Sequence, residues 1–325
     1  MRRAVRRCGS AAVLFLTTCG PPAGAPEELV VIPPGATLQA VADSLHAHGV
    51  IGSLGWFRLL ARVGRYDRRL RSGSYSIVRG SGARAALRAL TGKASLTRLT
   101  MPEGFTLLDM AEAAERALAI PRDSFLAAAR DTALLREFEV PAASFEGFLR
   151  PETYFFARGV PAGVVVREMA ATFRRDWNPA WNVPTGTRPA GLDRMGLVTL
   201  ASIVEGEARA DADRPLIAAV LLNRMRRGMP LQADATVQYA LQLASGERKP
   251  RLFEKDYGFP SPYNTYLHPG LPPGPIGAPS HKSLEAISNP APVPYLYYVA
   301  KPDGGHVFSR TYAEHLRAVA RLRRR

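Results

Sequence analysis

Two glutamates, Glu205 and Glu207, lie near the end of an apolar stretch, ASIVEGEA (residues 201–208). Val198, Ala201 and Glu205 recur at spacings of three and four, so a helix would place Glu205 beside its apolar face. Glu207 would then point away by more than half a turn, and we expect Glu205 to be the more buried carboxyl. Burial disfavours the ionised form, which suits a general acid that must hold a proton near neutral pH.

A structural role for Glu205 is the alternative. Arg209 follows it by four positions, and such a pair on a helix surface is worth only a few tenths of a kcal/mol. Because structural ion pairs also perturb carboxyl groups, the spacing alone leaves both roles open.

Two consecutive helices are predicted to position these groups. The first runs from about residue 195 to 208, with Asp193 as its cap, and the second covers DRPLIAAVLLNRMRRGM (residues 213–229). The segment LQADATVQY then brings Gln232 and Asp234 near the end of the helix pair. A pocket would need polar groups there, although polar residues after a helix are also ordinary.

A loop rich in proline and glycine, SPYNTYLHPGLPPGPIGAPS (residues 261–280), follows. Proline fixes φ and lowers the conformational freedom lost on ordering, so we expect a stiff loop. A long stiff loop is a candidate binding loop, and a plain surface connector is the alternative.

An internal repeat occupies the first half of the chain. Residues 30–43 and 99–112 align without gaps, and each reads as a strand, a Pro-x-Gly turn and a helix capped by Thr37 or Thr106. With a strand at residues 73–78, the first repeat predicts a small α/β module ahead of a larger part that mixes helices and short strands. The fold class expected is therefore α+β.

Composition limits the function classes. Lys and Arg number 43 against 28 Asp and Glu, a formal charge of +15, which favours an anionic partner such as a cell-wall polymer or membrane. The sequence has no basic patch interleaved with aromatic residues, so nucleic-acid binding is not expected. The two cysteines, Cys8 and Cys19, lie in the first twenty residues, and we expect no internal disulfide, metal site or cofactor.

The N-terminus has the order of an export signal. Four arginines precede a short apolar run, Ala11 to Leu16, which falls well below the roughly twenty residues needed to span a bilayer. LTTC, ending at Cys19, resembles a lipoprotein cleavage box, and an ordinary signal peptide or a poor membrane anchor is the alternative. We expect residues 1–19 to be a leader, with Cys19 lipidated if it is a lipoprotein, and residues 20–28 to be a linker.

Several long segments together resemble the endolytic murein transglycosylases of bacteria, the YceG-like family. They are ASIVEGEA, LLNRMRRGMPLQADATVQYAL, SPYNTYLHPGLPPGPIGAPSHKSLEA, PYLYYVAKPDGGHVF and the upstream EGFLRPETYF. The resemblance runs from residue 28 to the end. It implies a LysM-like subdomain at residues 29–94 and a YceG-like catalytic domain at residues 95–325.

The resemblance also implies an activity: cleavage of the β-1,4 bond between N-acetylmuramic acid and N-acetylglucosamine within a glycan strand, leaving a 1,6-anhydro end. Glu205 would be the catalytic acid, and Glu207 would have a structural role. Glu146 and Glu152 could line the cleft but are more often structural. The residues expected to hold the sugar are Asn264, Tyr263, Tyr266, Thr265, Gln232 and Asp234.

The partners implied are glycan strands and peptidoglycan synthases, with membrane association through the N-terminus at the periplasmic face of the inner membrane. The chain departs from the family pattern at Gly206, where a bulkier polar residue is common, and at Ala235, where proline is usual. The family's membrane-spanning helix is also missing, and a lipid on Cys19 would restore membrane proximity. A peptidoglycan hydrolase, in which Asp234 or Glu207 activates water, and an inactive wall-binding module are the alternatives.

Overall fold

A computed structural model describes residues 25–33, 35–92, 96–156, 158–177 and 192–323. The chain divides into two compact units, Met1–Ser95 and Leu96–Arg325. The leader, the linker up to residue 24 and Cys19 lie outside the described residues. In the part that the structure describes, no helix has the length and apolar character needed to cross a bilayer.

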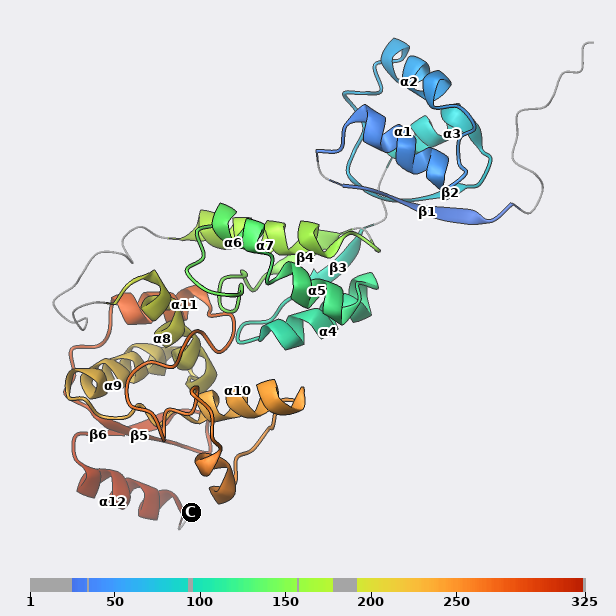
Figure 1. Ribbon diagram of the computed structural model, residues 1–325. Coiled ribbons are helices and arrows are strands. Elements are labelled where there is room, and N and C mark those ends of the chain that lie inside the picture. The colour runs from blue at the N-terminus through green and yellow to red at the C-terminus, as the bar shows by residue number, and fades with distance from the viewer. Residues whose placement is uncertain (1–24, 34, 93–95, 157, 178–191, 324–325) are drawn as a thin grey trace, which may run out of the picture. The chain divides into compact units, whose positions relative to one another are not determined.

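The first unit places three helices against a two-stranded sheet (Figure 1). Its elements are β1 (Glu27–Ile32), α1 (Leu38–Ala47), α2 (Leu54–Val63), β2 (Gly73–Val78) and α3 (Gly82–Thr91). β1 and β2 pair antiparallel, with Val30 opposite Tyr75. The predicted cap is confirmed, because the Thr37 side chain accepts a hydrogen bond from the Ala40 backbone at 3.2 Å. The likeness of this unit to a LysM domain stays a prediction.

The core of the first unit forms where both strands turn their alternate side chains toward the helices. Apolar residues from all five elements are buried there, among them Val30, Leu45, Phe57, Ile77 and Leu87. Burial of such side chains is the main favourable term in folding a unit of this size.

The second unit begins with a sheet of two strands distant in sequence. β3 (Thr97–Thr100) pairs antiparallel with β4 (Thr153–Phe156). The elements between and after them are α4 (Leu107–Leu118), α5 (Arg122–Ala128), α6 (Thr132–Glu137) and α7 (Ala162–Asp176). Thr106 caps α4 as predicted, and Asp109 completes a reciprocal capping box.

Four helices build the centre of the second unit: α8 (Arg194–Glu207), α9 (Arg214–Arg226), α10 (Asp234–Ser245) and α11 (His281–Ser288). The cap predicted for α8 is confirmed, since Asp193 accepts from the Gly196 backbone at 2.8 Å. Residues 196–204 of α8 are all buried, and α8 contacts α9, α10 and α11 (Figure 1). This helix is therefore a rigid support for the side chains at its C-terminal end.

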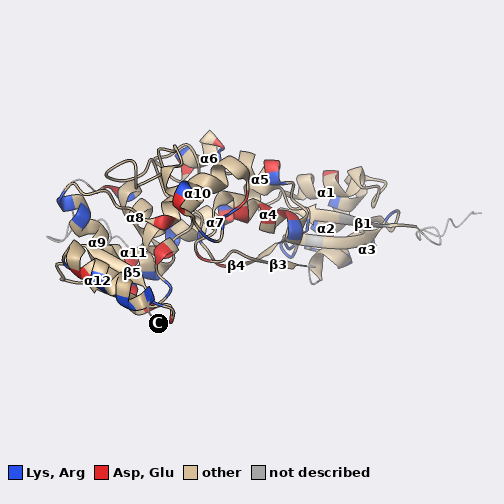
Figure 2. Cartoon of the chain, turned by 90° about the horizontal axis from the view of Figure 1, so that it is seen from below, with Lys and Arg blue, Asp and Glu red and all other residues tan. Residues whose placement is uncertain are grey.

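A hairpin and a helix complete the chain. β5 (Tyr297–Ala300) pairs antiparallel with β6 (His306–Ser309), and α12 (Tyr312–Arg323) contacts both strands. Short 3-10 turns at Asp211–Asp213 and Glu254–Gly258 join the helices. The α+β class predicted from the sequence is confirmed. Basic residues are scattered among the helices within each unit (Figure 2).

Candidate active site

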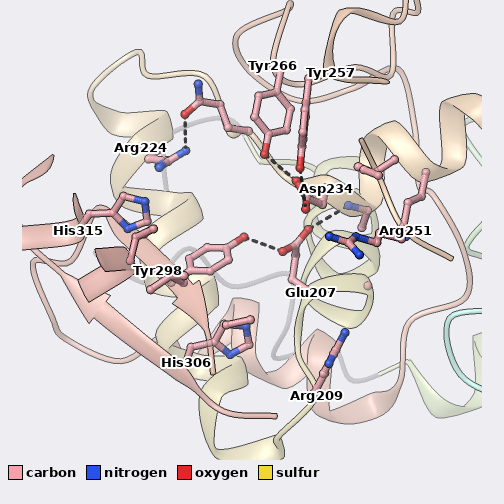
Figure 3. Close-up of a pocket in the computed structure, with 18 of the residues that line it drawn as sticks. Glu207, Arg209, Arg224, Asp234, Arg251, Tyr257, Tyr266, Tyr298, His306 and His315 are labelled. Atoms are coloured by element: carbon pink, nitrogen blue, oxygen red, sulfur yellow. Dashed lines mark hydrogen bonds between the residues drawn. The ribbon is translucent and has the colours of Figure 1, made fainter. Parts of the chain in front are cut away.

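The C-terminal end of α8 opens onto a cavity of about 620 Å³ in the second unit. Its walls come from α8, α9, the start of α10, the segment around residues 250–266, β5, β6 and α12 (Figure 3). Two carboxyl groups line it, those of Glu207 and Asp234. A cavity of this size with convergent polar groups is the ordinary form of a ligand site.

Glu207 is the last residue of α8, and both of its carboxyl oxygens are engaged. Oε1 accepts from the Ala235 backbone N–H at 3.0 Å, and Oε2 accepts from the Tyr298 hydroxyl at 3.1 Å. Ala233, at the N-cap of α10, makes no side-chain cap, so Glu207 satisfies one of the free N–H groups of that helix.

Burial raises the pKa of Glu207 to about 7, and the neighbouring Asp234 adds to the shift. The hydrogen bonds from Ala235 and Tyr298 act in the opposite direction, but the loss of hydration is the larger effect. Glu207 is thus a carboxyl that exchanges its proton near neutral pH at the wall of a cavity. This is the property that the sequence argument assigned to Glu205.

Glu205 lies on another side of α8 and is not among the residues that line the cavity. Its Oε2 atom accepts from the Ser280 backbone at 2.9 Å and from the Ser283 hydroxyl at 2.8 Å. The same oxygen lies 3.0 Å from Arg214 Nη1, in a pair whose side chains are 7% and 9% exposed. The predicted burial of the Glu205 side chain is confirmed, but the expectation that Glu207 is the less buried carboxyl is not, because loss of hydration is the largest effect on Glu207. The partner considered from sequence, Arg209, is replaced by Arg214.

Arg214 belongs to a small polar network between α9 and α11. Its Nη1 atom donates to Ser283 Oγ at 2.6 Å, and its Nε atom donates to Asp211 Oδ1 at 3.1 Å. Lys282 also pairs with Asp211. With a guanidinium, a hydroxyl and a backbone N–H converging on one oxygen, Glu205 has the surroundings of a structural ion pair.

Tyrosine side chains form the wall opposite Glu207. Tyr266 donates to Asp234 Oδ1 at 2.6 Å, Tyr257 reaches Asp234 Oδ2 at 3.4 Å, and the two rings lie 4.7 Å apart (Figure 3). Burial and Asp234 raise the pKa of both hydroxyls, so they stay protonated and act as donors. Flat rings with polar tips suit a sugar ligand.

The structure brings some of the predicted substrate residues to the cavity and leaves others inside the loop. Gln232, Asp234 and Tyr266 line the cavity. Asn264 is fully buried, and its amide donates to the Tyr257 and Phe259 carbonyls, both at 2.9 Å.

Thr265 and Tyr263 also lie away from the cavity. Thr265 Oγ1 accepts from the Ala233 backbone at 3.0 Å and contacts the Thr236 hydroxyl at 2.9 Å. Tyr263 packs edge-on against Tyr239, with ring centroids 4.9 Å apart. Asn264 and Thr265 thus hold the loop in place, because their polar atoms bond it to the preceding segment and to the start of α10.

Comparison with known proteins places the chain in a family. The sequence profile of the YceG-like family matches residues 30–321. The chain belongs to the YceG-like family. The resemblance of the sequence motifs to this family is therefore confirmed.

Two relatives and one solved structure support the assignment. An endolytic murein transglycosylase of Bacillus subtilis is 47% identical over 122 residues, which cover 38% of this chain and 33% of that protein. Another from Streptococcus pneumoniae is 33% identical over 177 residues, 54% of this chain and 32% of that protein. The matched segments thus span about a third of these relatives. A YceG-like protein from Listeria monocytogenes superposes with a TM-score of 0.60 at 27% identity, covering 90% of this chain and 99% of that one.

Sequence reasoning missed several residues of this YceG-like cavity. Tyr298 and His306 come from the hairpin, and their rings meet edge-on at 5.5 Å. His306 Nδ1 lies 2.8 Å from Asp213 Oδ2, so Asp213 orients the ring that supports Tyr298. Both residues lie in the motif PYLYYVAKPDGGHVF, which resembles the family. Nothing local in that motif distinguishes a strand residue that faces Glu207 from one that faces the core.

Two further buried polar residues, Arg224 and Glu146, have structural roles. Arg224 donates to the carbonyls of Leu296 at 2.7 Å and Leu231 at 2.8 Å, and its guanidinium also reaches Gln232 Oε1 at 3.3 Å. Burial raises the pKa of Glu146 to about 7, yet this residue accepts from the Leu107 backbone at the start of α4 and lies away from the cavity. Among the described residues, no group of three or more His, Cys, Asp or Glu could hold a metal ion.

Proposed function

We propose that this protein is a peptidoglycan lytic transglycosylase that cuts within glycan strands, between N-acetylmuramic acid and N-acetylglucosamine. The names of the matched Bacillus and Streptococcus proteins support the substrate and reaction class. The observation that carries the proposal is the position of Glu207, a desolvated carboxyl with a pKa of about 7 at the wall of the cavity.

In the proposed mechanism Glu207 acts first as an acid. Its proton passes to the glycosidic oxygen, and the bond from that oxygen to the muramic acid C1 breaks, with the electron pair leaving on the oxygen. The Glu207 carboxylate then takes the proton of the muramic acid 6-hydroxyl as O6 attacks C1. The ring closes without water, so one carboxyl serves as acid and then as base. Holding the 6-hydroxyl beside C1 gives it a large effective concentration relative to water.

The other groups of the cavity suit this cycle. Tyr298 and the Ala235 N–H hold Glu207 in place and stabilise the carboxylate that forms after the first step. Tyr266 and Tyr257 offer ring faces and hydroxyl donors to the sugars. The resemblance to the family implies that Glu205 is the catalytic acid. That assignment stays a prediction, and it is the alternative to Glu207.

A hydrolase is the second candidate, because Asp234 lines the same cavity as Glu207. Ordinary glycosidases use two carboxyl groups, one as acid and one to activate water or attack the sugar. Asp234, however, accepts hydrogen bonds from two tyrosine hydroxyls, which reduces its strength as a base.

The masses of the products distinguish the two reactions. The full chain would be incubated with uncrosslinked glycan strands, and the fragments analysed by mass spectrometry. A transglycosylase releases internal fragments that are one water lighter than hydrolysis products. Fragments that contain the added water would support the hydrolase and overturn the transglycosylase.

The raised pKa of Glu207 predicts a pH dependence. The free enzyme must hold the proton, and the protonated fraction falls as pH rises through about 7. We expect kcat/KM to be level below that pH and to fall about tenfold per pH unit above it. The measurement is the initial cleavage rate at low substrate from pH 5 to 9. A rate that keeps rising to pH 9 would contradict an acid role for Glu207.

We further propose that the chain is exported and acts at the periplasmic face of the inner membrane, beside peptidoglycan synthases. The order of basic, apolar and LTTC segments in residues 2–19 supports export, with Cys19 as the lipidation site. A single acyl chain gives only marginal membrane binding, so a second contact is part of this proposal.

A further inference from the structure

Two arginines border the cavity on the side of Glu207. Arg209 follows the end of α8, and Arg251 lies in the segment between α10 and the turn at Glu254–Gly258. Both residues are exposed. In Figure 3, Arg251 extends beside Asp234 and Glu207, and Arg209 lies below Glu207.

These arginines differ from Arg224, the third arginine of the cavity. Arg224 is buried and uses its donors on main-chain carbonyls and Gln232. The ion pairs of the described residues include neither Arg209 nor Arg251, and Arg251 instead lies over the Phe253 ring at 5.7 Å. Both therefore keep guanidinium donors for a ligand.

The acidic groups of the cavity do not neutralise this charge fully. Arg209 and Arg251 contribute two positive charges, whereas Asp234 contributes one negative charge and the Glu207 carboxyl is partly protonated at neutral pH. The rim beside the reacting carboxyl is consequently electropositive, and a planar guanidinium matches a carboxylate with two parallel hydrogen bonds.

We propose that Arg209 and Arg251 bind a carboxylate carried by the substituent on muramic acid, and so select strands by the state of that substituent. This inference rests on the proposed function, because it assigns a substrate feature to the same cavity. The sugar rings are otherwise uncharged, so carboxylates come from two sources. One is the peptide attached to the lactyl group, and the other is the lactyl group itself once the peptide has been removed.

The test compares the wild-type full chain with an Arg209→Gln, Arg251→Gln double variant. Three substrates are used: uncrosslinked strands with free peptide carboxylates, the same strands after amidation of those carboxylates, and strands stripped of peptide. On its carboxylate-bearing substrate the double variant should show a KM roughly tenfold higher with kcat unchanged. On amidated strands the two proteins should have equal KM. Arg227→Gln, an exposed arginine outside the cavity, is the matched control and should resemble wild type.

The substrates identify the source of the carboxylate. An effect confined to peptide-bearing strands assigns the arginines to the peptide, and an effect confined to stripped strands assigns them to the lactyl group. Equal KM values for wild type and double variant on all three substrates would overturn the inference.

Affinity measured without cleavage separates this inference from the proposed function. Binding of the same strands to Glu207→Gln is compared with binding to Glu207→Gln that also carries the two arginine changes. If wild type cleaves nothing, the proposed function fails, but a roughly tenfold loss of affinity with the arginine changes would still support the inference. Unchanged affinity would overturn it.

Discussion

Replacing Glu207 by glutamine should reduce cleavage of glycan strands by about 10²- to 10⁴-fold, the usual contribution of a general acid–base group. Glutamine keeps the size of the side chain and can still accept from the Ala235 backbone, but its amide has no acidic proton to transfer to the leaving oxygen. The measurement is the single-turnover rate on uncrosslinked strands, which excludes product release from the comparison.

Loss of fold is not expected to explain this effect. A buried carboxyl with a pKa raised to about 7 binds more protons in the folded than in the unfolded chain. The folded protein therefore loses stability as the pH rises from the pKa of this carboxyl in the unfolded chain toward 7. An uncharged side chain at this position removes that loss of stability. Glu207→Gln should unfold at the same or a higher urea concentration than wild type at pH 8. A variant that is inactive only because it is unfolded would contradict this account.

The second large effect is expected at Glu205, on stability. Glu205→Gln removes the charge that compensates the buried Arg214 guanidinium, and breaking a buried pair in this way costs about 3–5 kcal/mol. Urea denaturation of the variant measures the free energy of unfolding. Asp211→Asn is the matched control, because Asp211 pairs with the same arginine but is 57% exposed, and it should cost much less stability than Glu205→Gln.

A double change tests whether the cost comes from the pair. If the loss of the buried charge opposite Arg214 is the cause, Arg214→Met in the Glu205→Gln background should recover part of the lost stability, so the two changes should be less than additive. Full additivity would show that Glu205 and Arg214 act independently, and an unchanged free energy in Glu205→Gln would remove the structural role assigned here.

The sequence predicted those parts of the fold that depend on neighbouring residues. The caps Thr37, Thr106 and Asp193 and the strand at residues 73–78 all lie where local patterns placed them. In the motif PYLYYVAKPDGGHVF the strand begins only at Tyr297, because the residues before it form the connection from α11. The residue at which a strand begins depends on tertiary contacts, which local sequence patterns do not contain.

The candidate site was less predictable because its decisive contacts join distant residues. Helical spacing correctly separated the directions of Glu205 and Glu207, and it correctly predicted that Glu205 is buried. It could not indicate that Tyr298, 91 residues away, and the start of α10 would also desolvate Glu207. Nor could it find Arg214 and Ser283 around Glu205, since α11 is brought there by the fold.

The most direct test of this account is a side-by-side measurement of single-turnover cleavage by Glu205→Gln and Glu207→Gln, at a temperature where both are folded. Glu207→Gln should lose about 10²- to 10⁴-fold in rate, whereas Glu205→Gln, corrected for its folded fraction, should stay within about tenfold of wild type. The reverse result, an inactive but folded Glu205→Gln beside an active Glu207→Gln, would assign the acid to Glu205 and contradict the mechanism proposed for Glu207.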